Sequence, residues 1–219
     1  MTKLKIDIVS DVACPWCPIG YKRLEAAMRE LAEEDLSFAV EWHPFELAPD
    51  MPAEGEGIIS HLAHKYGRSE VETVTAQEGI IAAARKLGLD FGGALKRRAV
   101  NTFDAHRVLM WAGEQDRQTE FALALFDAYF GKAENPASPE VLRRVADSLR
   151  LDTVTVDEIL ASNRYADAVR KQEQSVQRAG IHAVPTFLVD GKLLIQGAQP
   201  PAAFTDALRR VSAQDVAAA

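Results

Sequence analysis

Two cysteines separated by two residues stand where a predicted strand meets a predicted helix. Leu4–Ser10 alternates apolar and polar residues, which predicts a β-strand. After Cys17, apolar residues recur at helical spacing at positions 19, 24, 27, 28 and 31. Ser37–Trp42 alternates again and predicts a second strand. The first 42 residues therefore predict a β-α-β unit with the Cys-Pro-Trp-Cys run, residues 14–17, at its first strand-to-helix turn.

A cysteine at the beginning of a helix is in a position that favours its thiolate. The thiolate is the nucleophile of disulfide exchange, and a free cysteine has a pKa of about 8.5, so little of it is ionised at neutral pH. The unpaired N–H groups and the positive end of the helix dipole favour a negative charge there. No basic residue lies between the cysteines, so we expect the backbone to supply this stabilisation. We expect Cys14 to be exposed and to attack first, and Cys17, one turn deeper, to resolve the mixed disulfide.

The two residues between the cysteines are predicted to contact the substrate. Pro15 suits an early helical position, because the N–H that it lacks would have no helical partner there. We expect Trp16 to lie exposed beside the sulfurs and to offer an apolar contact surface.

Two other uses of a Cys-x-x-Cys pair are less favoured by the sequence. Such a pair can be half of a zinc site. The chain has no further cysteine, and His61 and His64 lie far along the sequence at a spacing shorter than that of zinc fingers. A structural disulfide that closes so small a loop would add little stability. We therefore expect a redox-active pair and no metal site.

A block of helical patterns follows residue 57. The expected helices are Ile58–Tyr66, Ser69–Leu87, Asn101–Gln115, Glu120–Phe130, Pro139–Leu149 and Asp157–Ala179. Ser69, three residues before a glutamate, and Ser138, directly before a proline, predict helix N-caps. Gly180 predicts the end of the last of these helices.

Strands return at the end of the chain. Thr186–Val189 and Leu193–Ile195 flank Asp190-Gly191, which predicts a hairpin, and Pro201–Val211 predicts a final helix. We therefore expect one mixed sheet built from both ends of the chain, parallel in the β-α-β unit and antiparallel in the hairpin. The expected sheet domain is 1–48 with 165–219, and the inserted helical domain is 49–164.

Charge and hydropathy restrict the partners and the compartment. Lys and Arg number 25 against 32 Asp and Glu, a net charge of −7 without a basic run, so we expect no nucleic-acid binding. Asp7 and Asp11 interrupt the apolar start, so no signal peptide is predicted, and no stretch is long enough for a membrane span. We expect a cytoplasmic protein without membrane contact. Structural disulfides are rare in that compartment, which favours a reactive pair.

Four stretches resemble the DsbA-like branch of the thioredoxin superfamily, and most closely its FrnE-like members. They are SDVACPWC at 10–17, WHPFEL at 42–47, NTFDAHR at 101–107 and GIHAVPTF at 180–187. The resemblance spans nearly the whole chain. It implies an α/β, thioredoxin-like fold, in which a mixed β-sheet is flanked by helices and an all-α helical domain is inserted. It also implies a cis bond between Val184 and Pro185, in a loop that faces Cys14 and binds an extended substrate.

By this resemblance the chain is expected to be a protein disulfide oxidoreductase, which exchanges the Cys14–Cys17 pair with protein or small-molecule thiols and disulfides. No cofactor is expected to be required, and glutathione is a candidate redox partner. DsbA itself has Pro-His between its cysteines and an export signal; the Pro-Trp dipeptide here predicts a less oxidising pair. His43 and His106 are candidates for groove residues outside the catalytic set.

Two alternatives remain open at this stage. Some relatives carry serine at the first cysteine position and act as glutathione-dependent isomerases or transferases on small organic substrates. A redox-responsive binding module without turnover is the third hypothesis. The sequence does not decide the substrate, the direction of exchange, or whether the protein is a monomer or a homodimer.

Overall fold

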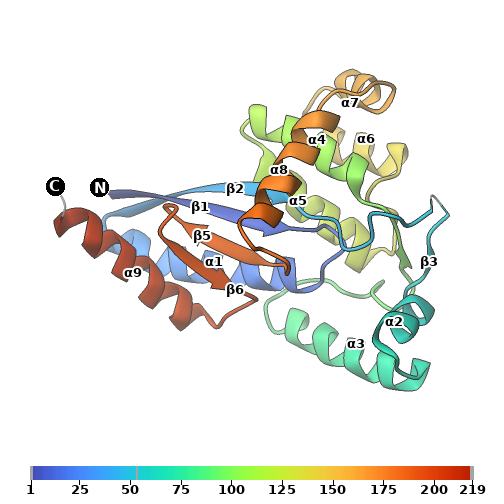
Figure 1. Ribbon diagram of the computed structural model, residues 1–219, viewed down its shortest axis with the longest axis horizontal. Helices are drawn as coiled ribbons and strands as arrows, with labels where there is room; N and C mark the ends of the chain where they lie inside the picture. Colours follow the sequence, from blue (N-terminus) through green and yellow to red (C-terminus); the bar gives the residue numbers. More distant parts are fainter. Residues whose placement is uncertain (1, 53, 218–219) are drawn as a thin grey trace.

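The computed structural model describes residues 2–52 and 54–217 and is built on a four-stranded sheet (Figure 1). The strand order is β2-β1-β5-β6, with β1 at Thr2–Ser10, β2 at Leu36–Pro44, β5 at Thr186–Val189 and β6 at Leu193–Gln196. β1 pairs in parallel with β2 and antiparallel with β5, and β5 and β6 form an antiparallel hairpin. The predicted mixed sheet from both ends of the chain is confirmed.

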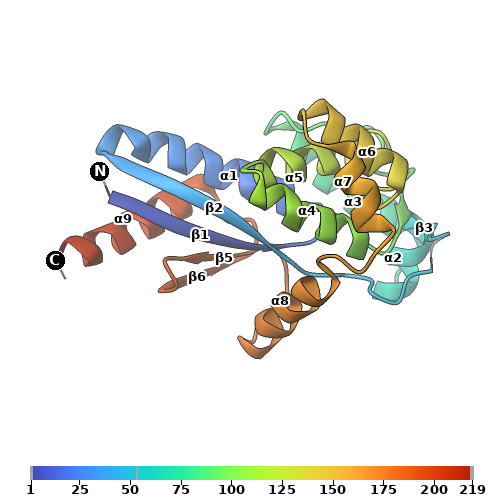
Figure 2. The ribbon, with the colours of Figure 1, turned by 90° about the horizontal axis from the view of Figure 1, so that it is seen from above.

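Helices cover both faces of this sheet. α1 (Trp16–Leu31) packs against α9 (Pro201–Ala217), while α8 (Ala166–Arg178) lies against β2 on the side opposite to α1 (Figure 2). A short 3₁₀ turn, η1 (Ala32–Glu34), joins α1 to β2. The fully buried side chains of this core include Leu4, Ile6, Ile8, Leu24, Phe187, Phe204 and Leu208. Phe187 meets Phe204 edge to face with ring centroids 4.9 Å apart, which ties β5 to α9.

The remaining helices gather at one end of the sheet, away from both termini (Figure 1). They are α2 (Ile58–Tyr66), α3 (Glu70–Arg85), α4 (Phe103–Glu114), α5 (Gln118–Phe126), α6 (Pro139–Ser148) and α7 (Thr153–Leu160), with a π-helical turn η2 (Asp127–Gly131). A two-residue ladder, β3 (Glu56–Gly57) with β4 (Arg98–Ala99), adds strand structure that the sequence did not predict. The domain limits at 49 and 164 stay a prediction. Within 2–52 and 54–217, no helix has the length and apolar character of a membrane span.

The helix caps and the hairpin turn that the sequence predicted are present in the structure. Ser69 and Glu72 form a capping box at α3, and Ser138 accepts a hydrogen bond from the N–H of Val141 at α6. Asp190 and Gly191 have φ values of 47° and 67°, the left-handed pair that a tight hairpin turn requires.

The single helix predicted over Asp157–Ala179 is wrong. Asp152 accepts hydrogen bonds from two backbone N–H groups and starts α7 earlier, at Thr153, and α7 ends at Leu160. The buried guanidinium of Arg107 then donates to the carbonyls of Ile159, Ser162 and Arg164. These carbonyls satisfy the buried cation only because the chain turns there, so a tertiary contact overrides the helical pattern.

The limits of other helices differ from the predicted limits by a few residues. α4 begins at Phe103 rather than Asn101, because the Asn101 side chain accepts from the N–H of Phe103 while its amide donates to the carbonyl of Pro49. α5 occupies Gln118–Phe126 rather than Glu120–Phe130, since its last turn widens into η2. α9 continues past Val211 to Ala217.

A pair of leucine substitutions tests the packing of α9. Leu208 is fully buried, whereas Leu194 on the edge strand β6 is 42% exposed. Leu208→Ala is expected to lower the free energy of unfolding by roughly 2–5 kcal/mol, because it removes buried methyl groups and leaves a cavity. Leu194→Ala, the matched control, is expected to cost below about 1 kcal/mol. Equal losses in denaturant titrations would contradict the placement of α9.

Candidate active site

The turn between β1 and α1 holds both cysteines. The N–H of Cys14 donates to the carbonyl of Asp11 at 3.0 Å, and the N–H of Cys17 donates to the carbonyl of Cys14 at 3.2 Å. Pro15 is the N-cap residue and Trp16 opens the helix. Trp16 is 39% exposed, so the predicted exposed tryptophan beside the cysteines is confirmed.

The predicted exposure of Cys14 is wrong. Cys14 is only 4% exposed and Cys17 is fully buried, both as free thiols. The segment before β5 covers the turn: the Cys14 thiol lies 3.6 Å from the carbonyl oxygen of Val184 and donates to it. The Val184–Pro185 peptide bond is cis. Pairing of β1 with β5 brings these segments together across 170 positions of sequence.

The two thiols differ in their electrostatic surroundings. Burial raises the pKa of Cys17 well above its ordinary value, and the hydrogen bond and charge of Cys14 raise it further, against smaller opposing effects of Ser10 and the backbone of Asp11. Cys17 therefore keeps its proton at neutral pH. A buried, protonated Cys17 suits the predicted roles, in which Cys14 attacks and Cys17 follows.

Cys14 opens into a pocket of about 580 Å³ between the sheet and the inserted helices. Pro15, Trp16 and Val184, three of the residues predicted to contact the substrate, line this pocket. Pro185, the fourth, does not line the pocket. Its ring packs close to Gly20 of α1, where an added Cβ would lie 3.2 Å from the proline Cγ. The other wall comes from α2, α3 and the segment 97–100, with His61 among its residues.

A buried carboxylate that the sequence did not single out fixes this turn. Asp11 is 1% exposed and accepts hydrogen bonds from the N–H groups of Ala13 at 3.0 Å and Leu47 at 2.6 Å. His106 lies 3.6 Å from the same carboxylate and donates through Nε2 to the carbonyl of Phe45 at 3.0 Å. His106 thus holds the segment after β2 beside the cysteine turn and does not line the pocket. An aspartate between a strand and a turn is the one local signal for this role.

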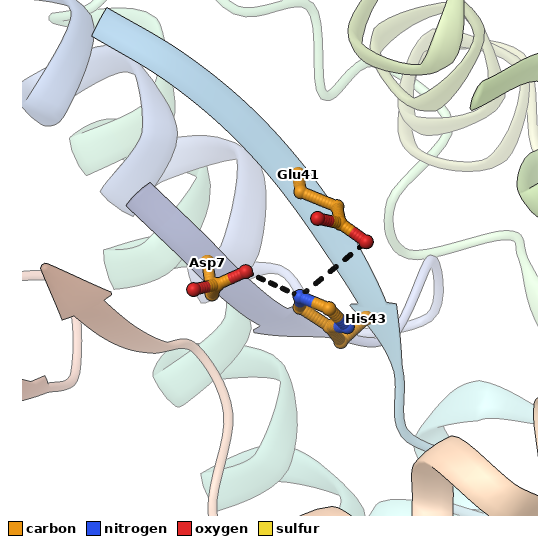
Figure 3. Close-up of side chains that lie close together, drawn as sticks. All are labelled: Asp7, Glu41 and His43. Carbon is orange, nitrogen blue, oxygen red and sulfur yellow. Dashed lines mark hydrogen bonds and ion pairs between the residues drawn. The ribbon is translucent and has the colours of Figure 1, made fainter. Parts of the chain in front are cut away.

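His43 belongs to a separate cluster on the sheet (Figure 3). Its Nε2 lies 2.7 Å from Asp7 and 4.0 Å from Glu41, and these three are the only potential metal-ligand group among the described residues. Lys5 forms ion pairs with both carboxylates at 2.9 and 2.7 Å, so a cation is already in place. Burial acts to raise the pKa of Asp7, but hydrogen bonds from His43 and Lys5 outweigh it and lower the pKa.

Size alone does not identify the site. A larger hollow of about 740 Å³ lies along β2 beside this cluster, and neither cysteine lines it. The smaller pocket is the candidate site, because the Cys14 sulfur, the predicted nucleophile, lines it.

Alkylation should separate the two thiols. At pH 7, iodoacetamide is expected to modify Cys14, which lines the pocket, and to leave Cys17 protonated and intact until strongly alkaline pH. Peptide mass spectrometry over a pH series measures both, with the Cys14→Ser and Cys17→Ser variants assigning the signals. Faster modification of Cys17 than of Cys14 at pH 7 would contradict this expected order of alkylation.

Removal of the Asp11 carboxylate should loosen the turn. Asp11→Ala leaves two half-buried N–H groups without their acceptor and is expected to cost about 2–4 kcal/mol of unfolding free energy. Asp11→Asn retains an acceptor oxygen and should cost less. Equal stability of Asp11→Ala and wild type in urea titrations would rule out this function of the carboxylate.

Comparison with known proteins agrees with this geometry. The family model of the DsbA-like thioredoxin domain matches residues 5–209. A crystal structure of a probable DsbA oxidoreductase, SCO1869 from Streptomyces coelicolor, is 31% identical, with a TM-score of 0.88 over 94% of this chain and 89% of that one.

Two more distant structures show a similar fold. A 2-hydroxychromene-2-carboxylate isomerase is 16% identical (TM-score 0.73, 98% of this chain and 99% of that one). The cytosolic disulfide reductase DsbM from Pseudomonas aeruginosa, solved with GSH, is 18% identical (TM-score 0.64, 94% and 98%). Because the family model matches most of its length, the chain belongs to the DsbA-like thioredoxin domain family.

Proposed function

We propose that this protein is a thiol–disulfide oxidoreductase that uses Cys14 and Cys17. The observation that carries the proposal is the pair of free thiols, one lining a pocket and the other fully buried behind it with a raised pKa. Two-step exchange requires one thiol that can meet the substrate and a second thiol that can reach the first.

In the reducing direction the reaction proceeds in two displacements. The Cys14 thiolate attacks one sulfur of a substrate disulfide, forms a mixed disulfide and releases the first substrate thiolate. Cys17 then loses its proton and attacks the Cys14 sulfur, which forms the Cys14–Cys17 disulfide and releases the second substrate thiolate. Two electrons pass from the protein dithiol to the substrate, and the reverse sequence oxidises a substrate dithiol.

The surroundings of Cys14 fit a substrate that approaches along the segment before β5. The Val184 carbonyl stands beside the sulfur, and Trp16 offers an exposed apolar surface next to it. We propose that Pro15, Trp16, Val184 and Pro185 form this contact surface, with Pro185 acting through the shape of the segment.

The comparisons support the chemistry at the level of the family. SCO1869 is described as a probable DsbA oxidoreductase, and DsbM as a cytosolic disulfide reductase solved with GSH. We therefore propose glutathione as a redox partner, a cytoplasmic location, and exchange without a bound cofactor.

A second function is a glutathione-dependent isomerase or transferase. The fold is shared with 2-hydroxychromene-2-carboxylate isomerase, and a pocket of about 580 Å³ has room for a small organic molecule. Such chemistry needs no resolving thiol, so the two functions differ in their need for Cys17.

Single serine variants distinguish these functions. Cys14→Ser is expected to abolish disulfide reduction, while Cys17→Ser should accumulate the mixed disulfide on Cys14 and lose turnover, measured by thiol release and intact mass. Retained exchange in Cys14→Ser would end the oxidoreductase proposal. Full turnover in Cys17→Ser would favour the isomerase or transferase.

The reduction potential of the pair tests the same proposal independently. Equilibration with glutathione buffers is expected to give a value between about −270 and −120 mV, the range of catalytic dithiols. A value below roughly −300 mV would indicate a stable structural bridge instead.

A further inference from the structure

Arg97 is a buried cation that the exchange reaction described above does not use. It is 2% exposed and lines the same pocket as Cys14. Its Nη2 donates to the side-chain oxygen of Gln77 at 3.0 Å, its Nη1 donates to the carbonyl of Ala94, and its Nε has no partner among the described residues. The guanidinium stands over the rings of Phe130 and Tyr129, with 5.0 and 5.5 Å to the ring centroids.

No carboxylate of the described residues forms an ion pair with this guanidinium. Burial lowers the pKa of Arg97, while Tyr129 and Cys14 act in the opposite direction, and the group stays cationic at neutral pH. A buried charge without a counter-ion is unfavourable, and native proteins normally pair it. Among the described residues, the structure therefore presents a cation without a paired anion in the same pocket as the reactive sulfur.

The rest of the pocket has the same sign of charge. The chain as a whole carries more Asp and Glu than Lys and Arg, 32 against 25. Among the described residues that line the pocket, however, none is Asp or Glu, and the charged or titratable ones besides Cys14 and Tyr residues are His61, Lys65, Arg68, Arg97 and His182. Lys65 and Arg68 are exposed, so they stand at the mouth while Arg97 is buried.

We propose that Arg97 binds a carboxylate of a small thiol or disulfide whose sulfur reaches Cys14, and that the pocket thereby selects anionic substrates. This inference rests on the proposed disulfide exchange and names its substrate class. A guanidinium offers N–H donors in a planar fork that matches a carboxylate, and such charge-assisted hydrogen bonds are the strong ones. The bonds to Ala94 and Gln77 use two of the five N–H donors, which leaves donors for a carboxylate, and the dry aromatic surroundings make such a bond more favourable than one at the surface.

Three disulfides of similar size and different charge test the selection. They are 3,3′-dithiodipropionate, a dianion; 2-hydroxyethyl disulfide, which is neutral; and cystamine, a dication. Each oxidation rate of the reduced protein is divided by the rate of the same disulfide with a free small thiol, which removes intrinsic reactivity. The wild type is expected to prefer the dianion over the neutral compound by at least about tenfold, the effect of one charge-assisted hydrogen bond.

Substitutions assign the preference to one residue. Arg97→Gln is expected to reduce the preference to near unity while the neutral disulfide still reacts, and Arg97→Lys should retain part of it. Arg29→Gln makes the same change in net charge on an arginine whose side chain is 74% exposed, outside the pocket, and should leave the preference intact. A uniform loss for all three disulfides in Arg97→Gln would instead mean that Arg97 acts on the Cys14 thiolate, and would overturn the proposal.

A measurement on the wild type avoids any folding defect of the variants. Suberate is the carbon analogue of the dianionic disulfide, and 1,6-hexanediol is that of the neutral one. Suberate is expected to inhibit exchange with 2-hydroxyethyl disulfide, whereas hexanediol at equal concentration should not. Equal effects of the two would overturn the anion site and leave the oxidoreductase function standing. Absence of exchange with any disulfide would instead overturn the proposed function itself.

Discussion

The antiparallel pairing of β1 with β5 is the constraint on which the site depends. Its register sets Ile8 opposite Phe187 and Val9 opposite Thr186, so the turn after β1 and the segment before β5 end at the same edge of the sheet. A slip by one residue would turn the buried Ile6 and Ile8 away from the core, so the pairing is strongly specified. The inserted helices follow β2, and the chain returns from them through α8 to β5. Residues of α2 and α3 line the pocket opposite Cys14.

Charge is distributed unevenly around that edge. The Asp11 carboxylate is satisfied by two backbone N–H groups and holds the turn in place. Burial raises the pKa of Cys17 and keeps its thiol neutral. Cys14 is the sulfur that lines the pocket. Across the pocket Arg97 is buried against aromatic rings with an unpartnered Nε. In an acidic protein, a pocket whose described lining residues include no Asp or Glu is a local property of the fold, and overall net charge does not predict it.

Local patterns predicted much of the architecture. The strand-helix-strand start, the Asp190-Gly191 hairpin and the caps at Ser69 and Ser138 depend on residues close in sequence, and the structure contains all of them. The predictions were wrong where a distant group competes with the local pattern. Arg107 draws three carbonyls into a turn between α7 and α8, where the periodicity favoured an unbroken helix.

By itself the sequence determined the mixed sheet, the position of the cysteine pair at a strand-to-helix turn, and the Trp16 surface beside it, because spacing and periodicity act over a few residues. Only the tertiary structure decided that Cys14 is covered, that Asp11 and His106 join the turn to the segment after β2, and that Arg97 enters the same pocket. These relations join residues that are tens of positions apart, and they arise from the burial of charged and polar groups among partners that local propensity does not specify.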